Sequence, residues 1–139
     1  MPGLVPLSTT TYRRLAVLWT GAMIVGFSLP AASLSPVEAA LSYDKAIHAA
    51  LFFGFAVLWM RSVCPPGAQD AATFRRCAVG MGVVGALFAV GSEGYQHLLP
   101  IRRVADPYDA LANGVGLLVG LLGYVLYGRR TASAAESAS

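Results

Sequence analysis

Charged side chains are scarce in this chain. Only 12% of its 139 residues are Asp, Glu, Lys or Arg, against about 25% in a typical soluble domain. Hydrophobic residues make up 56%, and the mean hydropathy is +0.61. A soluble domain with this composition would lack solubilising surface. We therefore expect an integral membrane protein. The length leaves room for one small domain and for no separate catalytic domain.

The common catalytic and cofactor motifs are missing. There is no glycine-rich phosphate loop of the P-loop type, no G-x-S-x-G, no H-E-x-x-H and no C-x-x-C segment. The two histidines and the carboxylates follow no spacing known for a metal site, so we expect no metal and no cofactor. The net charge of +3 comes from scattered basic pairs. Since no continuous basic stripe exists, nucleic acid is not expected as a partner.

Cysteine is rare as well. Cys64 and Cys77 flank one short loop. The charge distribution described below places this loop in the cytoplasm, where thiols stay reduced. We therefore expect both cysteines to be inert thiols.

Four long apolar segments are present, each near the roughly 20 residues that a helix needs to span hydrocarbon. They cover about 14–30 or 14–32, 45–63, 77–99 and 107–127, and are too long for strands. The predicted fold class is all-α, a polytopic membrane protein with four transmembrane helices. We expect an N-terminal cytoplasmic tail (1–12), a four-helix domain (13–128) and a disordered C-terminal tail (129–139). Cleavage of the first segment as a signal peptide, after Ala32 or Ser33, is the alternative.

The arginines predict the orientation, because cytoplasmic loops carry an excess of Arg and Lys. The ends of the segments on the other side carry Lys45, Arg102 and Arg103. Both termini and the loop between the second and third segments are therefore predicted to lie in the cytoplasm, in a bacterial inner membrane. The residues that place them there are Arg13, Arg14, Arg61, Arg75, Arg76, Arg129 and Arg130.

Polar side chains collect at the opposite, outward ends of three segments. The second segment begins with Asp44, Lys45 and His48, the third ends with Glu93 and Gln96, and the fourth begins with Asp109 and Asn113, which follow Asp106. Since all three ends emerge on the same side, we expect one outward-facing polar site. His97 is adjacent to Gln96 and is a weaker candidate.

Some of these groups have a purely structural explanation. Asp44, Asp106 and Asp109 fit helix N-termini, where a carboxylate caps free N–H groups and is favoured by the helix dipole. Asn113 can form a hydrogen bond that holds two helices together. His48 can be a packed histidine that donates to Asp44 or to a backbone carbonyl.

Glu93 fits no such explanation, because it lies near a helix C-terminus, where the dipole opposes a carboxylate. It needs a cation, a proton or water. Arg103 is the expected cation, with Arg102 as the alternative.

A face of small residues follows on the fourth segment. Ala112, Gly116 and Gly120 recur every four residues, which lets another helix approach closely. We expect this face to pack within the monomer, and dimerisation is the alternative.

Two motifs resemble the VanZ-like family of small bacterial membrane proteins. One is D-K-A-I-H at 44–48. The other begins with E-x-x-Q at 93–96 and continues through Pro100, Arg103, Asp106, Asp109, Asn113 and Gly116. The resemblance covers roughly 15–125 and implies a four-helix membrane protein. The family's usual P-G-R is P-I-R-R here, so either arginine can fill the family's arginine position.

Three functional hypotheses follow. The leading one is a membrane protein whose outward site recognises the head group of a lipid or of a lipid-linked cell-envelope precursor. The second is an enzyme acting on such a head group, with Glu93 or Asp109 as general base and a histidine as acid; the catalytic residues are otherwise unknown. The third is an accessory subunit that buries its polar groups against a partner membrane protein.

Overall fold

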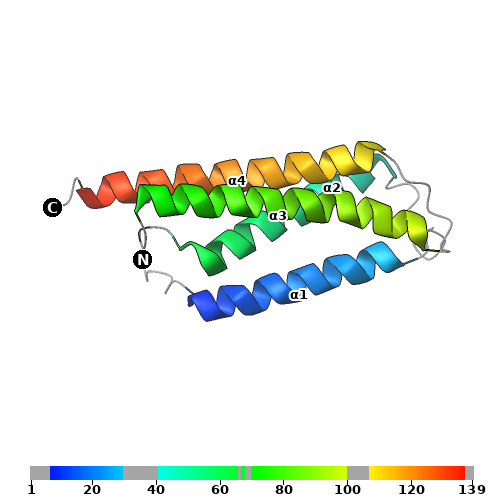
Figure 1. Ribbon diagram of the computed structural model, residues 1–139, viewed down its shortest axis with the longest axis horizontal. Coiled ribbons are helices and arrows are strands. Elements are labelled where there is room, and N and C mark those ends of the chain that lie inside the picture. Colours follow the sequence, from blue (N-terminus) through cyan, green and yellow to red (C-terminus); the bar gives the residue numbers. More distant parts are fainter. Residues whose placement is uncertain (1–6, 30–40, 66, 68–69, 100–106, 137–139) are drawn as a thin grey trace.

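The computed structural model describes residues 7–29, 41–65, 67, 70–99 and 107–136, with the side chains of 41–44 and 131–136 excepted. Four helices run back and forth along one long axis (Figure 1). They are α1 (Thr9–Ser28), α2 (Leu41–Val63), α3 (Ala71–Leu98) and α4 (Pro107–Glu136). The predicted all-α class is confirmed. Helix α2 is central and packs against each of the other three.

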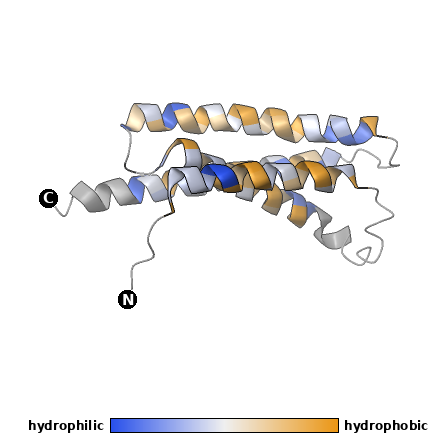
Figure 2. Cartoon of the chain, turned by 90° about the horizontal axis from the view of Figure 1, so that it is seen from below, coloured by the Kyte–Doolittle hydropathy of each residue, from blue (hydrophilic) through white to orange (hydrophobic). Residues whose placement is uncertain are grey.

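Three of these helices are long and apolar enough to cross a membrane. They are the stretches Lys45–Val63, Ala71–Leu98 and Pro107–Arg130. Helix α1, which carries Arg13 and Arg14 near its start, is not among them. Apolar residues prevail along the middle of the helices (Figure 2). By length and composition, α2, α3 and α4 thus meet the expectation of helices that could span a membrane.

Helix boundaries differ from the predicted ones mainly at N-termini. Helix α1 starts at Thr9, since the Ser8 hydroxyl accepts a bond from the Thr11 N–H at 3.1 Å. Helix α3 starts at Ala71 instead of residue 77, because Asp70 accepts bonds from the N–H groups of Ala72 and Thr73. Such capping satisfies N–H groups that have no partner within the helix.

Two further boundaries bear on the sequence interpretation. Helix α2 starts at Leu41, so Asp44 lies inside the helix and not before it. Helix α4 begins at Pro107 as predicted but continues to Glu136, through most of the tail expected to be disordered. The tail is rich in alanine, a strong helix former, so it can prolong a helix that is already nucleated.

Aromatic rings form much of the core between the helices. The rings of Phe27, Phe52, Phe55 and Phe88 follow one another with centroids 5.2–6.5 Å apart. Phe52 is fully buried. A second cluster lies toward the other end and contains Met60 and Tyr124. These contacts link α1, α2, α3 and α4 into one packed bundle.

Helices α2 and α4 approach most closely at the small-residue face. A side chain at Gly116 would overlap the backbone carbonyl of Ala49, and one at Gly120 would come within 2.9 Å of the Ala56 Cβ and 3.0 Å of the Phe53 oxygen. Only glycine allows two backbones to come this near. The prediction that this face packs within the monomer is confirmed.

Helix α1 is tied to α2 by two indole groups. The Trp19 Nε1 donates to the Leu51 carbonyl at 2.9 Å, and its ring covers Gly54. The Trp59 Nε1 donates to the Thr20 hydroxyl at 3.1 Å. These bonds hold α1 in the bundle although it is the least apolar of the four. Residues 32–33, where cleavage was the alternative, lie outside the described residues.

The cysteines are not separate thiols as expected. Cys64 and Cys77 form a disulfide between the end of α2 and the first turns of α3, with their Cα atoms 6.4 Å apart. Cys64 is fully buried. The expectation of inert, reduced thiols is therefore wrong for this structure. It rested on the compartment assigned to the loop, which says nothing about whether the two side chains face each other.

Candidate functional site

Three polar side chains from three helices form one chain of hydrogen bonds. The Asn113 amide in α4 donates from Nδ2 to the Glu93 Oε1 in α3 at 3.1 Å. The Asn113 Oδ1 lies 2.9 Å from the His48 Nδ1 in α2. Asn113 therefore connects its two neighbours, and the three residues are referred to below as the polar triad. Glu93 follows His48 by 45 residues and precedes Asn113 by 20, yet the three side chains meet at one point.

The pattern of donors and acceptors favours one tautomer of the His48 imidazole. A carboxylate accepts only, so the Asn113 atom facing Glu93 is the NH₂ group, which leaves its oxygen for His48. With Glu93 ionised, the His48 Nδ1 carries the proton and donates to the Asn113 Oδ1. Proton positions thus run in one direction, from the imidazole through the amide to the carboxylate.

The polar triad lies below the ends of its helices. Glu93 is five residues before the end of α3, Asn113 six residues after the start of α4, and His48 seven after the start of α2. At 1.5 Å per residue these positions are about 8–11 Å from the helix ends. Asn113 is fully buried and His48 is 3% exposed. Each position lies within an apolar helix, where an unsatisfied polar group costs several kcal/mol.

Helix α1 covers the imidazole. The ring of Phe27 stacks on that of His48, with centroids 5.6 Å apart and an interplanar angle of 19°. Next to Phe27, the Ser28 hydroxyl lies 3.0 Å from the hydroxyl of Tyr95 in α3. All four helices therefore contribute to this end of the bundle.

Gln96 lies one turn beyond Glu93 and is also buried, at 4% exposure. Its Nε2 has no hydrogen-bond partner among the described residues. Buried amide N–H groups are rarely left unpaired. His97, the adjacent residue, is exposed. The structure thus separates two candidates that the sequence placed side by side: Gln96 faces the interior and His97 does not.

An ion pair lies near the polar triad. The Lys45 Nζ is 3.5 Å from the Asp109 Oδ1, and it also lies 5.8 Å from the centre of the Tyr108 ring. Lys45 is half exposed and Asp109 14% exposed. Asp109 occupies the first turn of α4, as predicted. The sequence placed Lys45 among the polar groups at this end but not among the candidate site residues.

The predicted site residues fall into three groups. His48, Glu93 and Asn113 converge, with buried Gln96 on the same helix as Glu93. Asp109 forms a pair with Lys45 at the same end. The remaining predicted residues, Arg103 and Asp106, lie outside the described residues, as does the side chain of Asp44.

The opposite end has a different chemistry. The Arg61 guanidinium lies 4.9 Å from the ring centre of Tyr127, 5.5 Å from that of Tyr12 and 5.9 Å from that of Tyr124. The Tyr124 hydroxyl donates to the Cys64 carbonyl at 2.9 Å. Over the described residues, no group of three or more His, Cys, Asp and Glu side chains is placed to hold a metal ion.

Comparison with known proteins identifies no relative: no family model, curated protein or solved structure matches the chain.

Proposed function

We propose that the chain is a multi-pass inner-membrane protein, similar to the VanZ-like family, that recognises the head group of a lipid or lipid-linked envelope precursor. The polar triad carries this proposal. Its members are among the residues on which the resemblance rests, and they form one connected cluster. Proteins rarely keep such groups within apolar helices unless they have a use.

The nature of the polar groups favours a head group rich in hydroxyls. Gln96 supplies an N–H donor that has no acceptor within the described structure. Glu93, one turn away, supplies a carboxylate. A hydroxyl both donates and accepts, so sugar hydroxyls suit this mixture better than a bare phosphate. An apolar lipid tail would remain among the exposed leucines and valines of the helices.

The most direct test measures lipid binding by native mass spectrometry of the purified protein. The probes are a polyprenyl-phosphate sugar, phosphatidylethanolamine and phosphatidylglycerol. We expect the sugar-bearing lipid to bind best. Gln96→Leu should weaken its binding about tenfold, as expected when one hydrogen bond of roughly 1.4 kcal/mol is lost.

His97→Leu is the matched control. It alters the next residue, which is exposed at the same end of the bundle, and should leave binding unchanged. Equal binding of all three lipids, or equal effects of the two substitutions, would contradict head-group recognition. Conversion of the bound lipid to a new species would support an enzyme instead. Copurification of a single partner protein that protects Gln96 would favour an accessory subunit.

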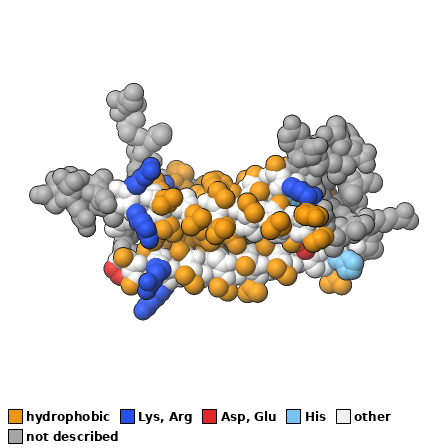
Figure 3. Space-filling model, turned by 90° about the horizontal axis from the view of Figure 1, so that it is seen from above, with side chains coloured by type: hydrophobic (Ala, Val, Ile, Leu, Met, Phe, Trp, Pro, Cys, Tyr) orange, Lys and Arg blue, Asp and Glu red, His pale blue; other side chains and the backbone are white. Residues whose placement is uncertain are grey.

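We further propose that the triad end faces outward and the arginine-rich end the cytoplasm. Arg13 and Arg14 in α1, Arg61 in α2, Arg75 and Arg76 in α3, and Arg129 and Arg130 in α4 all belong to one end of the bundle. Space-filling views show basic side chains gathered there, with an apolar band between the two ends (Figure 3). This distribution follows the positive-inside rule.

The disulfide counts against this orientation, because cytoplasmic thiols are kept reduced, so the orientation needs a direct test. In a Cys64→Ala/Cys77→Ala background, an impermeant maleimide added to spheroplasts should label His97→Cys but spare Arg76→Cys. Both positions are exposed. The reverse pattern would place the disulfide on the oxidising side and overturn the orientation. Head-group recognition is tested separately, on the purified protein, so the outcome of the labelling experiment does not decide it.

A further inference from the structure

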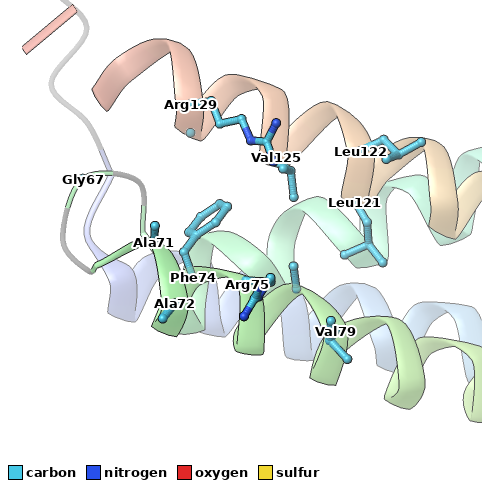
Figure 4. Close-up of a pocket in the computed structure, with 12 residues that line it drawn as sticks. Gly67, Ala71, Ala72, Phe74, Arg75, Val79, Leu121, Leu122, Val125 and Arg129 are labelled. Atoms are coloured by element: carbon cyan, nitrogen blue, oxygen red, sulfur yellow. The ribbon is translucent and has the colours of Figure 1, made fainter. Parts of the chain in front are cut away.

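A groove opens between α3 and α4 at the arginine-rich end. Its volume is about 640 Å³, within the range of roughly 300–1,000 Å³ that is usual for ligand pockets. One wall belongs to the first turns of α3 and the other to the stretch of α4 from Leu121 to Arg129 (Figure 4). The polar triad lies at the other end of these helices, so the groove is a separate feature.

The groove combines an apolar wall with two cations. Leu121, Leu122 and Val125 line it from α4, while Ala78 and Val79 line it from α3. Nearer the helix ends, the lining includes two arginines, Arg75 on α3 and Arg129 on α4. Both arginines are exposed, and they stand on opposite walls (Figure 4). Polarity therefore changes along the groove in the same sense as along a phospholipid.

Among the described side chains, Asp70 is the one acidic group at this end, and its carboxylate caps α3. Asp70 precedes the helix that forms one wall, and its Oδ1 accepts from the N–H groups of Ala72 and Thr73, while the Thr73 hydroxyl donates to Oδ2. Two more arginines, Arg76 and Arg130, flank the pair that lines the groove. The net charge at the mouth is therefore positive.

We propose that this groove binds an anionic phospholipid, with an acyl chain along the apolar wall and the phosphate between Arg75 and Arg129. Basic pockets between membrane helices bind anionic head groups through such charge complementarity. Because the helices on both sides are apolar enough to lie in a membrane, the occupant is supplied by the bilayer itself. Arginine also suits phosphate geometrically, since its planar fork donates in bidentate fashion.

The first experiment tests the head group. Native mass spectrometry in detergent would compare phosphatidylglycerol with phosphatidylcholine, for the wild type and for Arg75→Gln/Arg129→Gln. We expect the wild type to prefer phosphatidylglycerol. The double variant should bind it about 25-fold more weakly, because each arginine near an anionic surface contributes roughly a factor of five.

Arg13→Gln/Arg14→Gln is the matched control. It removes two exposed arginines at the same end, on a helix that does not line the groove, and should retain the preference. If it loses as much as the groove variant, the attraction is diffuse and the groove is not a site. Competition by inorganic phosphate at the same concentration as the lipid would show a phosphate site in place of a lipid site.

The second experiment tests the acyl chain. Leu122→Trp adds bulk inside the groove, whereas Leu118→Trp adds the same bulk one turn away, outside it. Both leucines are more than half exposed, so neither change disturbs the core. We expect only Leu122→Trp to weaken phosphatidylglycerol binding, by about tenfold or more if one acyl chain is displaced. Unchanged binding for both variants would contradict the proposal.

Discussion

The two ends of the bundle treat polar groups in opposite ways. At one end, His48, Asn113 and Glu93 are drawn between helices and joined by hydrogen bonds. At the other, Arg75 and Arg129 remain exposed and Arg61 lies among tyrosine rings. The first arrangement fixes the positions of specific atoms. The second leaves charges able to adapt to a surface.

This difference indicates where specificity resides. In a buried series of hydrogen bonds, losing one group leaves its neighbours unpaired, which costs free energy. A ligand that fits such groups is therefore recognised through defined donors and acceptors. Exposed cations such as Arg75 and Arg129 attract an anionic head group mainly by charge, an interaction that salt and lipid composition modulate. We therefore expect substitutions at the triad end to have larger effects than substitutions at the arginine-rich end.

The largest effect is expected where α2 and α4 touch. Gly116→Ala places a methyl group against the Ala49 backbone carbonyl, which is adjacent to His48. Backbone cannot yield as a side chain does, so the helices must separate and the bond between His48 and Asn113 must lengthen. We expect a loss of about 3 kcal/mol in the free energy of unfolding, at the upper end for overpacking. Titration with SDS in mixed micelles measures it.

Gly123→Ala provides the control on the same helix. A methyl group there meets no atom within 4 Å, and alanine favours helix by up to about 1 kcal/mol over glycine. The control should therefore be neutral or stabilising. If both substitutions have the same effect, the close approach of α2 and α4 does not support the triad end.

Asn113→Leu is expected to have the next largest effect. It introduces an apolar side chain of similar size and removes both hydrogen bonds, leaving His48 and Glu93 without this partner. Loss of a partner for a buried polar group costs about 1–3 kcal/mol. We expect a loss of roughly 2–3 kcal/mol by SDS titration, together with loss of head-group binding.

A double-mutant cycle sharpens this prediction. His48→Phe should be less harmful in the Asn113→Leu background than alone, because the bond that it breaks is already absent. Strict additivity of the two substitutions would mean that the two residues do not interact. The triad would then be reduced to a contact between Asn113 and Glu93.

Much of the fold could be predicted from the sequence because it follows from length and polarity. Apolar stretches of about 20 residues were sufficient to predict the four helices. The small-residue face of α4 was sufficient to predict the close helix contact at Gly116. Helix starts were harder to predict. The α3 start depends on Asp70 capping a segment, 71–76, that contains two arginines and no apolar run.

The site was predicted at the level of composition, but its connections were not. The positions of His48, Glu93 and Asn113 within their apolar segments were enough to predict that they lie at one end of the bundle. Sequence spacing cannot show how helices rotate about their axes, so it could not show that Asn113 bridges the other two. The pairing of Lys45 with Asp109 was not predicted for the same reason, since it depends on how α2 faces α4. The pairing of Cys64 with Cys77 likewise depends on rotation.

A smaller effect is expected from the arginine enclosed by tyrosines. Arg61→Gln removes the charge facing the rings of Tyr12, Tyr124 and Tyr127. Partly buried cation–π contacts contribute on the order of 1 kcal/mol, so we expect a loss of about this size by SDS titration. Arg76→Gln, at an exposed position without such contacts in the described structure, should change little. Equal effects would show that charge alone matters at this end.

The smallest effect is expected at Asp70, and it should depend on pH. Hydrogen bonds from the N–H and hydroxyl of Thr73 hold the pKa of this carboxyl below its ordinary value of 3.8. A carboxyl with a lowered folded-state pKa stabilises the fold above its ordinary pKa, and this contribution is lost as the pH falls through the lowered value. Asp70→Asn keeps a good capping side chain but removes the charge. The wild type should therefore have the higher unfolding midpoint at pH 6, and the gap should close as the pH falls below 3.8. A gap that persists in strong acid would assign the difference to cap geometry, and Asp70 would then add nothing electrostatic at the arginine-rich end.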